Sequence, residues 1–240
     1  MTANFSQTSK SNVDRFVLNA FEVAAGAWDE ILRPKAPIQY AVRSSLFLDN
    51  NVAITYEINE QSKTWVIEVN QAYVEIFKND PRNGRLAMIG TFVHEIAHSL
   101  GIGGNLWRFY FKENGEINLD EIQRSENFYA NLLAALEGTV ISGVDGHHSR
   151  RAFDLWFDDH DFREFVLPNT VAMMRILGHT YKERDDDPAE LAQRLNQYVL
   201  DHANQADNDG RGAGGSRAED GGSSPKSPSG GRSHTHTEVA

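Results

Sequence analysis

The sequence predicts an α+β fold, with one antiparallel or mixed sheet and helices packed on it. Two observations carry this prediction. Stretches rich in strand-forming residues lie together early in the chain, and stretches with apolar residues at helical spacing dominate after them. The length of 240 residues favours one domain, which we place at residues 1–200.

A long helix and three strands are expected first. Apolar residues recur at helical spacing over residues 14–32, and Pro34 ends the pattern. The three strands predicted after it are 38–47, 52–58 and 64–69. We interpret the last of them as an edge strand, which an extended peptide could join as an added strand.

Helices are expected in the rest of the domain. Their predicted ranges are 85–100, 119–136, 150–157, 170–177 and 188–200. Asp187 and Pro188 form a favourable N-cap and first helical residue for the last of them. Residues 201–240 contain eight of the 19 glycines and, among larger aliphatic and aromatic residues, only Val239. This composition predicts a disordered Gly/Ser-rich tail.

The composition argues against several classes of function. Lysine and arginine number 23 against 34 aspartates and glutamates, and the net charge of −11 disfavours a nucleic-acid partner. The absence of cysteine excludes disulfides, thiolate metal ligands and cysteine nucleophiles. No apolar run approaches the roughly 18 residues of a membrane span. No signal-peptide pattern opens the chain, so we expect either the cytoplasm or export by a route without a leader.

The motif that carries chemistry is His-Glu-x-x-His, inside the predicted helix 85–100. Histidines four residues apart lie on one helix face, so the imidazoles of His94 and His98 can reach the same Zn²⁺. Glu95 lies about 100° around the helix, close enough to touch a metal-bound water without being a ligand. The motif therefore predicts a catalytic zinc site.

A catalytic zinc usually has three protein ligands, and the third is not local here. Compact metzincins have a histidine six residues after the second one, where this chain has Gly104. Two residues further along are candidates. His147 lies in a turn flanked by glycine, and Glu126 lies on the next predicted helix, as a gluzincin-type ligand would.

Several segments around the motif are similar to one known family. They are residues 94–107, 20–32, 129–134 and 171–179. Together they resemble the leishmanolysin-like branch of the metzincin zinc metallopeptidases, over about residues 12 to 182. That branch delivers its third histidine from a distal motif in which Gly-His is followed by Trp. The resemblance therefore favours His147, which follows Gly146, and makes His148, at the tryptophan position, the second candidate.

The resemblance implies a zincin/metzincin-like fold, in which a mixed sheet and an active-site helix are followed by a mainly helical C-terminal part. It also implies a zinc-dependent endopeptidase that acts on a peptide or protein substrate. His94, His98 and His147 would hold Zn²⁺, and Glu95 would act as the general base toward the metal-activated water.

Two other hypotheses stay open. A gluzincin-type peptidase would use Glu126 as its third ligand. A non-catalytic binding protein on a degenerate zincin scaffold is favoured by Gly104 and by residues 153–158, which lack the methionine that the family has after its third histidine. Glu95 argues against the binding protein, because a purely structural metal site does not need it.

Several other polar residues have simpler interpretations. Tyr129 and Tyr181 are candidate donors to an oxyanion, although the sequence does not place them in space. His179 and His202 are isolated and are expected to be structural or exposed. Residues 158–161 are acidic, and we interpret them as a solvated loop rather than a calcium site.

Overall fold

The computed structural model describes residues 4–7, 13–48, 51–59, 64–139, 164–183 and 187–203. Its main sheet has four strands in the order β1 (Phe5–Gln7), β3 (Ile38–Ser45), β5 (Thr64–Asn70) and β4 (Ala53–Asn59). The first three are parallel, and β4 runs antiparallel to β5. The sheet is therefore mixed, as predicted.

The expectation that residues 64–69 form an edge strand is wrong. Strand β5 pairs with β3 on one side, from Thr64 to Asn70, and with β4 on the other. Its two buried faces explain the near-continuous apolar run at Val66 and Ile67, which is typical of an internal strand. Among the described strands of this sheet, the edge beside β5 is β4.

Eight helices are described. They are α1 (Arg15–Ile31), α2 (Gln71–Lys78), α3 (Gly84–Ser99), α4 (Asn105–Phe109), α5 (Leu119–Arg124), α6 (Asn131–Leu136), α7 (Pro168–Ile176) and α8 (Pro188–His202). A second small sheet pairs β2 (Leu32–Arg33) with β6 (Thr180–Tyr181) in antiparallel fashion. None of the described helices is long and apolar enough to cross a membrane.

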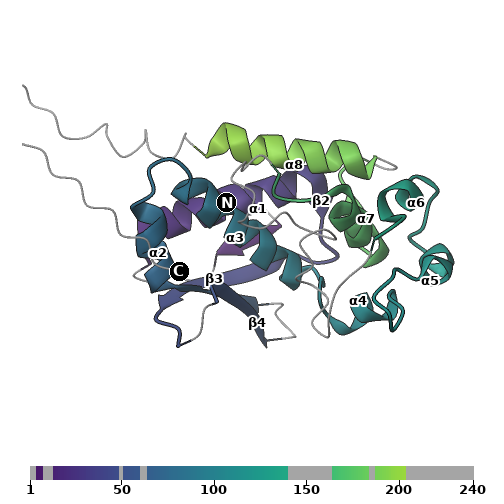
Figure 1. The fold of residues 1–240 in the computed structure, drawn as a ribbon, viewed down its shortest axis with the longest axis horizontal. Coiled ribbons are helices and arrows are strands. Elements are labelled where there is room, and N and C mark those ends of the chain that lie inside the picture. The colour runs from purple at the N-terminus through teal and green to yellow at the C-terminus, as the bar shows by residue number, and fades with distance from the viewer. Residues whose placement is uncertain are drawn as a thin grey trace, which may run out of the picture.

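Helices α1, α3 and α8 are layered over one side of the main sheet, whereas α5 and α6 lie to its right (Figure 1). Helices α1 and α3 pack against each other, α3 also contacts β4 and β5, and α8 packs on α1 and α7. Aromatic side chains fill the space between α1, α3 and β3. The ring of Phe21 meets those of Tyr40 and Phe92 edge-on, with centroids 5.3 and 5.5 Å apart.

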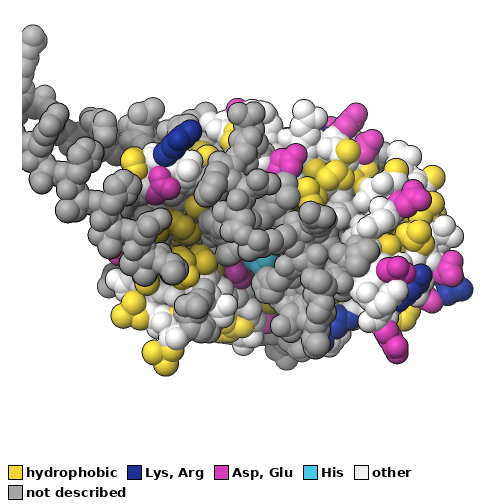
Figure 2. All heavy atoms as spheres, in the orientation of Figure 1, with side chains coloured by type: hydrophobic (Ala, Val, Ile, Leu, Met, Phe, Trp, Pro, Cys, Tyr) yellow, Lys and Arg dark blue, Asp and Glu magenta, His cyan; other side chains and the backbone are white. Residues whose placement is uncertain are grey.

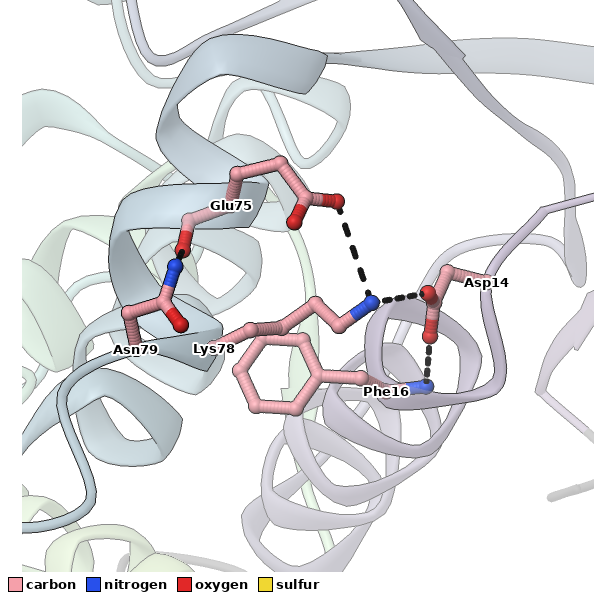
Figure 3. Close-up of polar contacts among 5 residues, drawn as sticks. All are labelled: Asp14, Phe16, Glu75, Lys78 and Asn79. Carbon is pink, nitrogen blue, oxygen red and sulfur yellow. Dashed lines mark hydrogen bonds and ion pairs between the residues drawn. The ribbon is translucent and has the colours of Figure 1, made fainter.

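A polar contact fixes the start of α1 against α2 (Figure 3). Asp14 is the N-cap of α1, because its Oδ1 accepts the backbone N–H of Phe16 over 2.8 Å. Its Oδ2 accepts the Lys78 ammonium over 2.7 Å, and Glu75 lies 3.8 Å from that same nitrogen. The hydrogen bond from Lys78, with that from Phe16, lowers the pKa of the Asp14 carboxyl below its ordinary value.

The predicted elements differ from the observed ones at identifiable places. Residues 119–136 form two short helices, α5 and α6, instead of one. The chain becomes extended at Ser125, whose Oγ accepts the backbone N–H of Asn127, a local bond that competes with the helix. Helix α2 was not predicted. Helix α8 continues to His202 and Ala203 is buried, so the body extends past residue 200.

Two further expectations cannot be compared with the structure. The predicted helix 150–157 and the tail from residue 204 onward lie outside the described residues.

Candidate metal centre

Helix α3 brings His94 and His98 together. Their Nε2 atoms lie 3.0 Å apart, and their rings are perpendicular with centroids separated by 4.6 Å. Two nitrogen ligands at zinc-bond lengths and a tetrahedral angle would lie about 3.3 Å apart. His94 is buried and His98 is half-buried. The pair therefore has nearly the spacing that one tetrahedral zinc ion requires.

The loop after α3 fixes the protonation of His98. Its Nδ1 lies 3.1 Å from the carbonyl oxygen of Ile102, and since a carbonyl can only accept, Nδ1 carries the proton. In the neutral ring, the lone pair is then on Nε2, the atom that faces His94. The positive φ angles of Gly101 (106°) and Gly103 (78°) let the chain turn back far enough for this contact. A backbone carbonyl that orients a ligating histidine in this way is a common feature of metal sites.

Glu95 lies on the neighbouring side of the helix and is directed toward β4. Its side chain is 5% exposed, and its Oε2 accepts the hydroxyl proton of Thr55 over 2.6 Å. The Thr55 hydroxyl also lies 3.3 Å from the backbone oxygen of Glu95. The carboxylate is thus held between the motif helix and the edge strand, beside the histidine pair.

Side chains from other elements contact α3 on both sides of the motif and hold the helix in place. Trp28 of α1 donates its indole N–H to the carbonyl oxygen of Val93 over 3.0 Å. Near the other end of the motif, the hydroxyls of Tyr40 and Ser99 lie 2.5 Å apart. Ser99 donates to the carbonyl of Ile96 over 2.7 Å, so Tyr40 is the donor of the first bond. Burial raises the pKa of the Tyr40 hydroxyl above its ordinary value.

His179 anchors the C-terminal end of the same helix. Its Nε2 donates to the carbonyl oxygen of Leu100 over 2.7 Å, and its Nδ1 accepts the backbone N–H of Lys35 over 3.4 Å. Burial lowers the pKa of this imidazole, and the nearby Lys35 charge adds to the effect, whereas the bond to Leu100 opposes it. His179 is therefore a structural histidine, as predicted. His202 is also structural, since it stacks on Tyr198 and contacts that residue's carbonyl oxygen.

Of the three candidates for the third ligand, only Glu126 lies within the described residues. His147 and His148 lie outside the described residues. Glu126 is exposed in the turn between α5 and α6, which lie at the right of Figure 1, whereas α3 lies near the centre. Within the described ranges, no three His, Asp or Glu side chains form a group that could hold a metal ion. The described part of the chain thus unites His94 with His98 and does not bring Glu126 to them.

The tyrosines and acidic residues considered as further site residues have different outcomes. The hydroxyl of Tyr181 is buried and donates to the carbonyl oxygen of Val171 over 2.9 Å, so the oxyanion role considered for it is wrong. Tyr129 packs its ring edge-on against Tyr181, with centroids 6.5 Å apart. Residues 153–161, which include the acidic stretch, lie outside the described part.

Figure 2 shows side chains of the described residues on one face of the molecule. A histidine side chain reaches the surface near the middle of the face shown, with an acidic side chain beside it. Hydrophobic side chains are exposed at the lower left of the same face.

No family model, curated protein or solved structure matches this chain.

Proposed function

We propose that this chain is a zinc-dependent endopeptidase of the metzincin type, similar to the leishmanolysin-like branch. The observation that carries the proposal is the paired geometry of His94 and His98. Their Nε2 atoms face each other at 3.0 Å, and the Ile102 carbonyl fixes the tautomer of His98 so that its lone pair points into the pair. In the metal-free chain, His94 can fill this space by donating its Nε2 proton to His98, and in its other tautomer both Nε2 lone pairs would be directed at one shared cation.

In this proposal, each residue of the motif has a separate role. His94 and His98 bind the metal from one helix face, and His147 supplies the third ligand. A bound zinc ion would supply Lewis acidity that lowers the pKa of water toward about 7. Glu95 accepts the proton of the attacking water and returns it to the leaving amine. Its low exposure (5%) keeps this carboxylate away from bulk solvent.

The substrate is a peptide or protein in an extended conformation. Support comes from β4, which pairs with β5 on one side and provides Thr55 beside Glu95. A peptide that joins the outer side of an edge strand gains main-chain hydrogen bonds along its length. This arrangement would place the backbone of the substrate next to the general base.

Metal analysis tests the ligand set. We would measure zinc by mass spectrometry in the purified wild-type protein and in His98→Ala, His147→Ala and Glu126→Ala. We expect about one zinc per chain in the wild type and in Glu126→Ala, and a loss of zinc in the two histidine variants. Loss in Glu126→Ala with retention in His147→Ala would instead indicate the gluzincin-type site.

Cleavage of a peptide library tests the activity, with Glu95→Gln as the matched control. This variant keeps zinc and should lose turnover by a factor of about 100 or more, because a general base contributes a factor of about 100 to 10,000. Full activity in Glu95→Gln would contradict the mechanism. A wild-type protein that binds zinc in a closed coordination shell and cleaves nothing would indicate the non-catalytic binding protein.

A further inference from the structure

The contact between Thr55 and Glu95 joins the edge strand to the motif helix across 40 residues of sequence. Thr55 is paired with Ile67 of β5, so both side chains lie on the same face of the sheet. Ile67 belongs to the hydrophobic core beneath α3. The Thr55 hydroxyl therefore points toward the helices, where it contacts Glu95 of the motif.

The two sides of this contact differ in conformational freedom. A glutamate side chain has three rotatable bonds, whereas the β-branched side chain of threonine has a restricted χ1. The backbone of Thr55 lies in the paired part of β4, where residues from Ala53 to Glu57 oppose β5 in continuous register. The hydroxyl is thus a fixed donor, and the 2.6 Å bond to Oε2 restricts the more mobile carboxylate.

We propose that Thr55 is a positioning residue, which holds the Glu95 carboxylate at the orientation needed for proton transfer. Its catalytic consequence rests on the proposed function, but the contact itself does not. Proton transfer requires the base within hydrogen-bond reach of the proton, and a misplacement of about 1 Å can cost a factor of 100 in rate.

Two variants separate the hydroxyl from the shape of the side chain. Thr55→Val removes the donor and keeps the volume, whereas Thr55→Ser keeps the donor. The matched control is Thr91→Val, because Thr91 is a threonine near the motif whose hydroxyl donates to the carbonyl oxygen of Ala87 within α3. Thr91 is buried, whereas Thr55 is half-buried. We expect Thr55→Val to lower kcat roughly 10-fold to 100-fold and to change KM less than 2-fold. Thr55→Ser should recover most of the lost kcat, and Thr91→Val should remain close to wild type.

Two further measurements do not depend on turnover. The zinc content of Thr55→Val should equal that of the wild type, because neither Thr55 nor Glu95 is a ligand in the proposed site. In the metal-free protein, Thr55→Val should lower the melting temperature by about 3 °C in the wild-type background, and by less than half of that in a Glu95→Ala background. This difference arises because the hydroxyl has lost its carboxylate partner in the second background.

The outcomes distinguish this inference from the proposed function. If the wild type cleaves peptides and Thr55→Val is as active as Thr91→Val, Thr55 has no positioning role while the peptidase assignment stands. If the wild type cleaves nothing, the peptidase assignment fails and the positioning role of Thr55 in proton transfer fails with it. In that case, equal effects of Thr55→Val in both backgrounds would also show that the hydroxyl does not hold Glu95, and unequal effects would support the contact alone.

Discussion

The indole nitrogen of Trp28 and the carbonyl oxygen of Val93 are hydrogen-bonded over 3.0 Å, one residue before the first histidine of the motif. Both residues are buried, and 65 positions separate them in the sequence. The opening helix of the domain therefore contacts the motif helix through a specific polar bond as well as through apolar packing.

Trp28→Phe should lower the free energy of unfolding by roughly 2–4 kcal/mol. The substitution removes one buried hydrogen bond and leaves a cavity where the indole was. Urea unfolding of the metal-free protein measures this loss. Phe21→Leu is the comparison, because it trims the same core without breaking a hydrogen bond at α3. A loss below about 0.5 kcal/mol in Trp28→Phe would show that the bond to Val93 contributes little.

Gly84→Ala adds only one methyl group, but it should lower the free energy of unfolding substantially. Gly84 begins α3, and a Cβ there would overlap the backbone carbonyl of Phe77 at the end of α2. Backbone atoms cannot move aside as a flexible side chain does, so we expect a cost of roughly 2–4 kcal/mol.

Gly138→Ala is the control for that substitution. Gly138 has a φ of +75° but has no neighbouring atom within 4 Å of the Cβ position, so only the backbone preference should be lost. That cost is about 1–2 kcal/mol. Thermal unfolding of both variants tests the order, and a larger effect for Gly138→Ala would contradict the packing described between α2 and α3.

Asp14→Ala should destabilise the protein more than Lys78→Met. The first substitution removes both the N-cap of α1 and the ion pair, and the cap alone is worth about 1 kcal/mol. The second removes only a partly exposed ion pair, which contributes little in water.

The contribution of Asp14 depends on pH, because its pKa is lowered in the folded state. It is present above the ordinary carboxyl pKa of about 3.9 and is lost as the pH falls through the lowered folded value. Urea unfolding at neutral and strongly acidic pH measures it. The difference between wild type and Asp14→Ala should shrink in acid, and an unchanged difference would contradict the assigned contact.

The lowered pKa of His179 predicts a second effect of pH on stability, in a different pH range. Burial lowers its pKa in the folded state, so the unfolded chain binds the proton more readily. Its neutral form contributes fully above the unfolded pKa of about 6.5, and this stability is lost as the pH falls through the lowered folded value. The free energy of unfolding should therefore fall between pH 7.5 and 5 more steeply in the wild type than in His179→Gln. Equal slopes in the two proteins would show that His179 is not the titrating group.

The longest elements were predictable because their signals are local. Apolar spacing defines α1 and α8 closely, and Asp187 accepts the backbone N–H of Ala189 as expected of the predicted N-cap of α8. The break at Ser125 depends on one side-chain bond, and the position of β5 between β3 and β4 depends on the pairing of distant strands. Neither the break at Ser125 nor the strand order produces a repeating pattern in the sequence, so hydrophobic periodicity could not predict them.

The same distinction applies to the candidate site. His94 and His98 face one another because four residues make about one helical turn, which holds wherever the helix lies. Thr55 could not be found in this way, since its contact with Glu95 requires the register of β4 and the placement of α3 above it. An inward-facing threonine in a predicted strand is a weak signal by itself. His147 and His148 stay predictions, because they lie outside the described residues.

The anchors of α3 also determine when the histidine pair can become ordered during synthesis. The bond between Leu100 and His179 joins residues 79 positions apart, so this contact at the end of the motif helix cannot form until the chain beyond α7 has been made. Contacts of this range form late, because the closure of long loops is costly in entropy. An incomplete chain therefore contains the whole motif without its final support. For a protein that cleaves peptides, such an order of assembly would delay activity until the domain itself is no longer an unfolded substrate.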